Sequence, residues 1–178
     1  MTLKKKIENF FEYKFSKGPT KIYSKIFGRN VKNKKQHLFV RTAKKLGLNI
    51  IIIGPHQDKT IKLDCTHFPL PHEEALEYLN QSQFYVDTST FEGFGMTPVE
   101  AAFLNKPTIA SDIYVHKEVL GNYPLYFKSG DIHDLCNKIK ILINNDYEID
   151  KNSLRLIKKK YSIENCTNKL KEYIEWVF

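Results

Sequence analysis

Residues 87–107, DTSTFEGFGMTPVEAAFLNKP, lead from a strand to a helix through a turn that contains two glycines. The stretch follows an apolar, β-prone run at 84–86, passes Gly93 and Gly95, and enters a short apolar helix that begins near Pro98. A strand, a glycine turn and a helix N-terminus in this order direct backbone N–H groups at one point, where they can bind an anion. The fold must therefore place a strand end and a helix start at one binding edge.

Short apolar runs alternate with helical patterns along the rest of the chain. The run NIIII at 49–53 has no polar alternation, which is typical of a strand covered on both faces and hence of a parallel sheet. Strands are expected at 21–27, 49–53, 60–67, 83–87, 108–110 and 125–127, and further helices at 37–46, 72–80, 113–120, 131–143 and, as one or two helices, 151–178. This alternation predicts a single α/β domain with a Rossmann-like, doubly wound parallel sheet of about six strands.

Composition agrees with a globular domain. The chain has 178 residues, 42% of them apolar and 27% charged, which suits one domain with a core of its own. No apolar run reaches the roughly 18–20 residues that span a bilayer, and no signal-peptide core follows the N-terminal lysines, so a cytoplasmic location is expected. The three cysteines are distant in sequence and odd in number, and the histidines lack zinc-binding spacing, so we expect neither a disulfide framework nor a metal site.

Residues 1–20 form a segment separate from the domain expected over 21–178. Apolar residues recur there at helical spacing among lysines, and Gly18 and Pro19 end the pattern. We interpret the segment as an amphipathic helix packed on the domain; the alternatives are a surface for a partner protein and peripheral contact with an anionic membrane. At the other end, Trp176 and Phe178 are expected to dock the C-terminal helices on the domain.

The net charge of +8 favours anionic ligands, although a solvated lysine-rich surface accounts for much of it. Arg29, Lys32 and Lys34 follow the first expected strand, at the carboxyl edge where α/β folds bind ligands. The alternative is an exposed basic turn. Nucleic-acid binding is not expected, because no aromatic–basic RNA motif is present.

Glu100 has a structural interpretation beside a functional one. Thr97, Pro98 and Glu100 fit a capping box with proline at the first helical position, in which Thr97 and Glu100 would satisfy each other's backbone N–H groups. Spacing alone leaves both interpretations open, and the two glycines likewise form no complete phosphate-binding fingerprint.

The segment E-G-F-G-M-T-P-V-E at 92–100 resembles the Glu-x7-Glu motif of retaining glycosyltransferases with the GT-B fold, in particular glycosyltransferase family 4. The segments KPTIASD at 106–112 and VHKEVLG at 115–121 also resemble the family, and the likeness covers roughly residues 21–144. It implies a hexosyltransferase-type enzyme that retains the configuration at the sugar carbon. It also implies that this chain is the C-terminal, nucleotide-sugar-binding half of a GT-B enzyme.

The resemblance implies roles for individual residues. Glu100 would hydrogen-bond the ribose hydroxyls, Glu92 would lie near the donor sugar, and Arg29 and Lys34 would hold the diphosphate. Lys35 stands where the family pattern often has glycine, so Lys32 is the alternative to Lys34. Further contacts are implied for Gly28 at the end of the first strand, for the backbone of Phe94, Gly95, Met96 and Thr97 with the sugar and phosphates, and for Phe68 and Leu70 with the base, unless these two side chains belong to the core.

The donor would be a UDP- or GDP-sugar. No D-x-D pair is present to hold a divalent ion, so we expect no metal and no cofactor, with arginine and lysine in the place of Mg²⁺. The acceptor domain would come from a partner chain, from self-association or from a further N-terminal segment. The alternative function is a nucleotide-sugar-binding module without turnover, and a basic protein that contacts RNA or a membrane ranks third.

Overall fold

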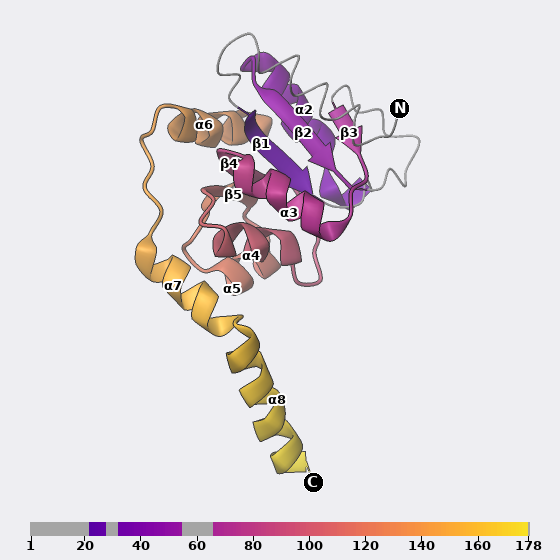
Figure 1. Cartoon of the computed structure of the whole chain (residues 1–178). Coiled ribbons are helices and arrows are strands. Elements are labelled where there is room, and N and C mark those ends of the chain that lie inside the picture. The colour runs from indigo at the N-terminus through magenta and orange to yellow at the C-terminus, as the bar shows by residue number, and fades with distance from the viewer. Residues whose placement is uncertain (1–21, 28–31, 55–65, 178) are drawn as a thin grey trace.

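The computed structural model describes residues 22–27, 32–54 and 66–177, which form a sheet with helices on both of its faces (Figure 1). Six strands pair in the order β3-β2-β1-β4-β5-β6, and every pairing is parallel. Their bounds are Ile22–Phe27 (β1), Asn49–Ile53 (β2), Thr66–Phe68 (β3), Phe84–Asp87 (β4), Thr108–Ser111 (β5) and Leu125–Phe127 (β6). The prediction of an α/β, Rossmann-like fold with a parallel sheet is confirmed.

Helices connect the strands and cover the two faces of the sheet. Those described are η1 (Lys32–Lys34), α2 (Gln36–Lys45), α3 (His72–Gln81), α4 (Met96–Phe103), α5 (Tyr114–Leu120), α6 (Ile132–Ile143), α7 (Lys151–Lys160) and α8 (Ile163–Val177). One core cluster joins α2 and α6 to one face of the sheet. Two further clusters join α3, α4, α5 and α7 to the opposite face.

The continuous apolar run of β2 is explained by this double covering. Ile52 packs in the cluster under α2 and α6, whereas Ile51 and Ile53 pack in a cluster with α3 and α4. Successive side chains of a strand point to opposite faces, so a strand covered on both sides needs apolar residues at every position. Phe84 and Tyr85 of β4 divide between the two faces in the same way.

The strand order reverses its direction between β1 and β4, which are neighbours although two strands separate them in sequence. In an open parallel sheet such a switch point leaves a crevice at the carboxyl ends of the two strands, and ligands bind there. The basic segment after β1 and the glycine turn after β4 both belong to this crevice.

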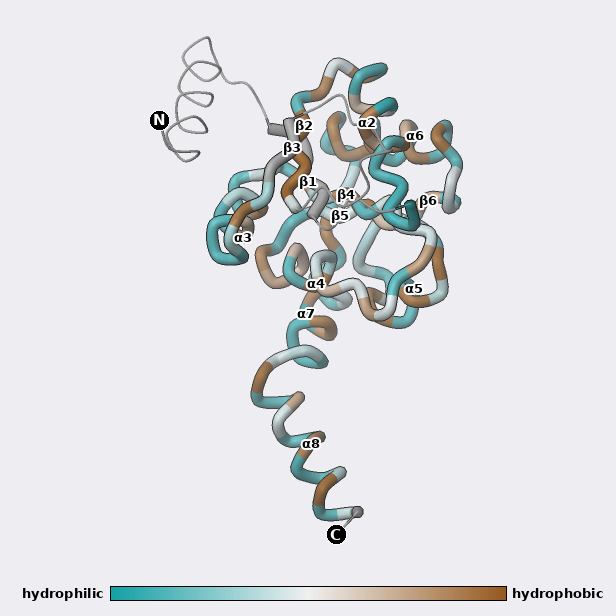
Figure 2. Tube along the Cα trace, turned by 90° about the vertical axis from the view of Figure 1, so that its right-hand side faces the viewer, coloured by the Kyte–Doolittle hydropathy of each residue, from teal (hydrophilic) through white to brown (hydrophobic). Residues whose placement is uncertain are grey.

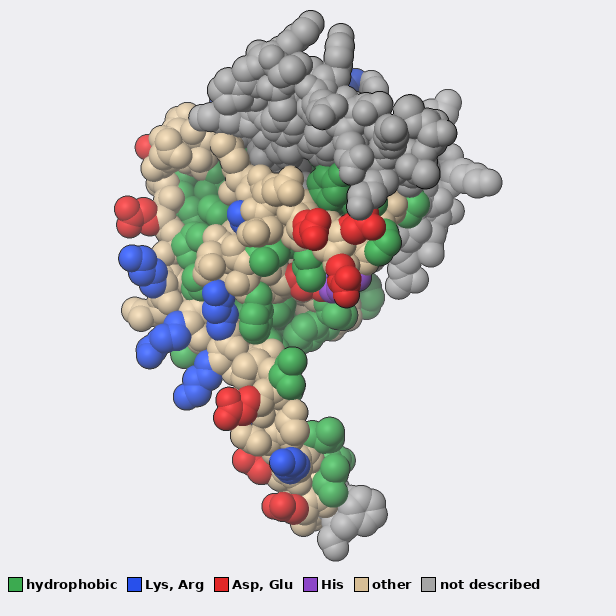
Figure 3. Space-filling view, viewed as in Figure 1, with side chains coloured by type: hydrophobic (Ala, Val, Ile, Leu, Met, Phe, Trp, Pro, Cys, Tyr) green, Lys and Arg blue, Asp and Glu red, His purple; other side chains and the backbone are tan. Residues whose placement is uncertain are grey.

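The C-terminal helix α8 projects away from the domain (Figures 1 and 2). Trp176 is 81% exposed, so the prediction that it docks the tail on the domain is wrong; Phe178 lies outside the described residues. The helix α7 does pack, through the buried Ile157, but the chain takes a new direction after it, before the apolar stripe of α8 begins. That stripe lies along one side of α8 (Figure 3) and includes the exposed residues Ile163, Leu170, Tyr173 and Ile174.

Several expectations fall outside the described residues: the N-terminal segment 1–20, most of the strand expected at 60–67, and the positions of Gly28 and Arg29. Within residues 22–27, 32–54 and 66–177, no helix has the length and apolar character that crossing a bilayer requires.

Candidate functional site

The segment that follows β1 is joined to the loop that follows β4 by hydrogen bonds. The Thr88 hydroxyl donates to the Lys34 carbonyl at 2.7 Å, and the Thr90 N–H donates to the Asn33 carbonyl at 2.7 Å. The Asn33 side-chain amide donates in return to the Phe91 carbonyl at 3.0 Å. These bonds hold η1 against the β4–α4 loop, so the basic segment and the glycine turn form one edge.

Lys34 and Glu92 form an ion pair across this edge, between Lys34 Nζ and Glu92 Oε1. Their side chains are only 17% and 11% exposed, so water screens the pair less than it screens a surface pair. A hydrogen bond between two charged groups is short and strong. The structure thus brings together two of the residues that the sequence assigns to the donor site.

Gly95 is the N-cap residue that directly precedes the helix α4. Its φ of +78° lies in the left-handed region, which glycine enters without steric cost. The helix starts at Met96, two positions before the start expected near Pro98. The capping-box interpretation of Thr97, which the spacing left open, is wrong, because the left-handed turn at Gly95 starts the helix before Thr97. No side chain caps this N-terminus, so its first N–H groups keep the capacity to bind an anion.

Glu100 lies in the second turn of α4 and faces α3. Its Oε1 is 3.7 Å from His72 Nε2, at the first residue of α3. Burial raises the pKa of Glu100 above its usual value, and the nearby His72 opposes that rise. Since no capping contact occupies the carboxylate, the structural interpretation of Glu100 loses its support.

The side chains of the glycine turn point in different directions. Phe94 packs its ring edge-to-face on Tyr161, at the end of α7, with ring centroids 5.2 Å apart. Met96 is exposed. Any contact of these two residues with a ligand phosphate is left to their backbone N–H groups, as the resemblance implies.

The two candidates for the base contact lie at the carboxyl end of β3 and in the short loop that leads to α3. Phe68 ends β3, an edge strand, and Leu70 is half-buried against the core cluster that contains Ile51 and Leu79. Leu70 therefore contributes to the core at least with part of its surface.

A buried polar network beneath the turn was missed by the sequence analysis. Asp87, at the end of β4, accepts hydrogen bonds from the Ser89 N–H at 2.9 Å, from the Ser89 hydroxyl, and from the Tyr85 hydroxyl at 3.1 Å. His116 Nε2 lies 3.8 Å from Asp87 Oδ2, and Ser111 holds the other side of the imidazole. The available signal was that Asp87 and Ser111 are polar residues ending adjacent apolar strands.

The pKa of Asp87 is lowered although its carboxyl is fully buried. Burial by itself would raise that pKa, but the charges of His116 and Lys34, together with the hydrogen bonds from Ser89, favour the ionised form. Asp87 is thus a buried anion that interacts with Lys34 from below, while Glu92 contacts the same ammonium at the rim.

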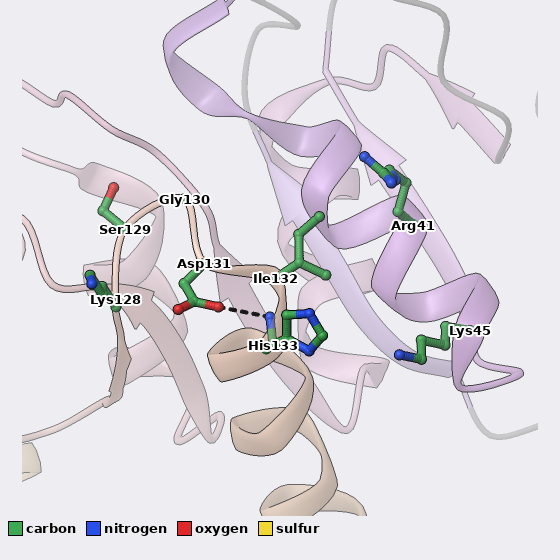
Figure 4. A pocket seen from close by; sticks show the side chains of 8 residues that line it. All are labelled: Arg41, Lys45, Lys128, Ser129, Gly130, Asp131, Ile132 and His133. Atoms are coloured by element: carbon green, nitrogen blue, oxygen red, sulfur yellow. Dashed lines mark hydrogen bonds between the residues drawn. The ribbon is translucent and has the colours of Figure 1, made fainter.

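A separate pocket of about 700 Å³ lies between α2 and the start of α6 (Figure 4). It is lined by Arg41 and Lys45 of α2 and by residues of the loop between β6 and α6. Asp131 Oδ1 caps α6 by accepting from the His133 and Asp134 N–H groups. None of the residues predicted for the donor site lines this pocket.

A Rossmann-like domain with a cation and an uncapped helix N-terminus at its switch point is the arrangement of a protein that binds phosphorylated ligands. The chain belongs to the family described as glycosyl transferases group 1, whose model matches residues 5–163. This confirms the resemblance found in the sequence.

Individual relatives agree with that membership. The O-antigen chain mannosyltransferase RfbU of Salmonella typhimurium is 30% identical over 127 residues, which are 64% of this chain and 36% of the relative. An uncharacterised glycosyltransferase of Methanocaldococcus jannaschii is 27% identical over 163 residues, which are 83% of this chain and 46% of the relative. This chain therefore spans between about a third and a half of these relatives.

Solved structures show the same fold. The structure of HepE of Anabaena in complex with UDP superposes with a TM-score of 0.78 at 14% identity, over 94% of this chain and 52% of HepE. A second HepE structure, in complex with UDP-glucose, gives the same TM-score at 15% identity.

Proposed function

We propose that this chain is the donor-binding half of a glycosyltransferase and binds a nucleotide-diphosphate sugar, UDP- or GDP-linked, at the carboxyl ends of β1 and β4. The single observation that carries the proposal is the Lys34–Glu92 ion pair beside the uncapped N-terminus of α4. A diphosphate placed there would meet an ammonium group and converging backbone N–H groups. The relatives with UDP and UDP-glucose support the same ligand class.

The proposed reaction breaks the bond between the sugar C1 and the diphosphate oxygen and forms a bond between C1 and a nucleophilic atom of the acceptor, which loses its proton, while the nucleoside diphosphate leaves. Negative charge develops on the leaving oxygen and positive charge on the sugar ring. Lys34 and the N–H groups at the start of α4 would stabilise the leaving diphosphate, since preorganised donors act on charge as it develops. The Glu92 carboxylate would stand beside the sugar, and Glu100 would bind the ribose. Transfer with retention is what the family resemblance implies.

Transfer without a metal ion is part of the proposal. The sequence has no D-x-D pair, and Lys34, with Arg29 from outside the described residues, would supply the positive charge. Because the chain spans half or less of its relatives, the acceptor would be bound by a further domain, supplied by a partner chain, by self-association or by additional sequence.

The test is a melting experiment with UDP, GDP, UDP-glucose, GDP-mannose and the free nucleosides. A ligand that binds only the folded chain stabilises it by about 2.7 kcal/mol at a hundred times its Kd. We expect one diphosphate series to raise the melting temperature more than its nucleoside does. Equal effects of nucleoside and diphosphate, or none from any nucleotide, would contradict the donor site.

A nucleotide-sugar-binding module without turnover is the alternative function, and the family match does not favour it over transfer. Radiolabelled sugar transfer to candidate acceptors separates the two. Tight nucleotide binding without transfer or hydrolysis, also with partner chains present, would support the module.

A further inference from the structure

His116 lies in α5 and is fully buried beneath the glycine turn. Its Nδ1 is 2.9 Å from the Ser111 carbonyl oxygen and 3.1 Å from the Ser111 hydroxyl. The Ser111 hydroxyl donates its proton to the Ser89 carbonyl, and a carbonyl oxygen only accepts. Nδ1 of His116 therefore carries a proton and donates it to Ser111. One side of the imidazole is thereby fixed to the end of β5.

The other side of the ring faces the glycine turn. His116 Nε2 has no hydrogen-bond partner among the described residues, and a buried polar nitrogen in that state calls for an explanation. A Cβ placed on Gly95 would stand 3.7 Å from His116 Cδ2 and 3.8 Å from Nε2. The ring edge thus lies beside Gly95, close enough that a side chain at this position would contact it.

The same edge of the ring faces the buried anion of the site. Nε2 is 3.8 Å from Asp87 Oδ2, and that oxygen also accepts from the Tyr85 hydroxyl. Asp87 interacts electrostatically with Lys34, whose ammonium contacts Glu92. His116 therefore lies next to the carboxylate that interacts with Lys34, and its ring also lies beside Gly95.

We propose that His116 is a positioning residue of the donor site. Its ring fills the space beside Gly95, where α4 begins, and its Nε2 edge sets the position of the Asp87 carboxylate, whose negative charge acts on the Lys34 ammonium. The residue is buried and touches no ligand. This inference rests on the proposed function, because the groups that His116 positions would bind the donor diphosphate.

The test compares the natural chain with His116→Phe, which keeps a ring beneath Gly95 but has no nitrogen to bind Ser111 or face Asp87. The dissociation constants of UDP and uridine are measured by calorimetry, and the melting temperature is recorded without ligand. We expect UDP affinity to fall about tenfold, which is 1.4 kcal/mol, with uridine affinity unchanged. A residue that only supports the fold would lower the melting temperature and leave the ratio of UDP to uridine affinity as it was.

A milder variant keeps the proposal testable if His116→Phe does not fold. Ser111→Ala removes the hydroxyl contacts with Nδ1 and with the Ser89 carbonyl and leaves the contact of Nδ1 with the Ser111 carbonyl. We therefore expect a smaller fall of the same ratio, about threefold or 0.65 kcal/mol. A ratio that stays at the natural value in the folded variant overturns the inference. If the natural chain binds GDP and not UDP, GDP and guanosine take the place of UDP and uridine in both comparisons. If neither diphosphate binds better than its nucleoside, the proposed function fails and this inference with it.

Discussion

Lys34 and Glu92 stand 58 positions apart in the sequence and form an ion pair at the ligand edge of the sheet. The contact exists because β1 and β4 are neighbours in the sheet, which brings the residues after them to one place. The Lys34 ammonium pairs with Glu92 and interacts electrostatically with the buried Asp87. A bound diphosphate would compete for this ammonium.

Replacing Lys34 with methionine should weaken diphosphate binding selectively. A hydrogen bond to a charged group contributes about 1.5–3 kcal/mol, so we expect the Kd of UDP to rise at least tenfold and that of uridine to stay within twofold. Lys45→Met, on the exposed surface of α2, is the matched control with the same change of charge. Equal losses for UDP and uridine, or equal effects of both variants, would exclude a diphosphate role for Lys34.

Gly95→Ala should reduce both stability and UDP affinity. Both Gly95 (φ +78°) and Gly47 (φ +66°) have left-handed backbones, where an L side chain costs about 1–2 kcal/mol. Gly47→Ala, after α2, is therefore the control, because it introduces the same backbone strain at a position outside the candidate donor site. In urea denaturation we expect similar losses of unfolding free energy from both, but weaker UDP binding in Gly95→Ala alone. Unchanged UDP affinity in Gly95→Ala would show that the turn does not contact the ligand.

Glu100→Gln should weaken nucleotide binding without loss of stability. Burial raises the pKa of Glu100 above 4.5, so the ionised carboxylate is less favourable in the folded chain than in the unfolded chain. Its contribution to stability is greatest below the unfolded pKa and falls as the pH rises through the folded pKa. Glutamine does not ionise, so at pH 7 the variant should melt at or above the melting temperature of the natural chain. It should also lose less stability than the natural chain as the pH rises from the unfolded pKa of Glu100 through its folded pKa.

The ribose is common to UDP and uridine, so Glu100→Gln should weaken the binding of both, by about tenfold if one charged hydrogen bond is lost. This pattern differs from that of Lys34→Met. A lower melting temperature with unchanged uridine affinity would return Glu100 to a purely structural role.

Removal of divalent metal should leave donor binding intact. Because Lys34 and the α4 N–H groups supply the positive potential, we expect EDTA to change the Kd of UDP by less than about twofold, a difference below 0.5 kcal/mol. Titration with Mg²⁺ after dialysis completes the comparison. UDP binding that appears only with Mg²⁺ would refute the metal-independent mechanism.

The two C-terminal helices should differ in their contribution to stability. Ile157 of α7 is 4% exposed and Ile163 of α8 is 87% exposed. Truncation of a buried isoleucine to alanine costs about 2–5 kcal/mol, whereas an exposed one costs about 0.5 kcal/mol or less. We therefore expect Ile157→Ala to lower the unfolding free energy strongly and Ile163→Ala to leave it nearly unchanged. A large effect of Ile163→Ala would mean that α8 is covered in solution.

The sequence by itself determined the order and type of the described elements, because strands covered on both faces and amphipathic helices leave patterns of fixed period. The helix start was misplaced for a local reason: the capping-box spacing at Thr97 ignored the left-handed turn that Gly95 permits two positions earlier. The family was also readable, since the Glu92–Glu100 motif lies within nine consecutive residues.

Only the tertiary structure decided which side chains meet. The Lys34–Glu92 pair and the contact of His116 with Asp87 join residues of different elements, and their distances depend on the sheet order and on side-chain packing, which have no sequence period. The exposure of Trp176 was decided in the same way. An apolar stripe indicates that a helix can bury one side. The direction of the chain before α8 determines whether this domain provides the surface on which that side packs.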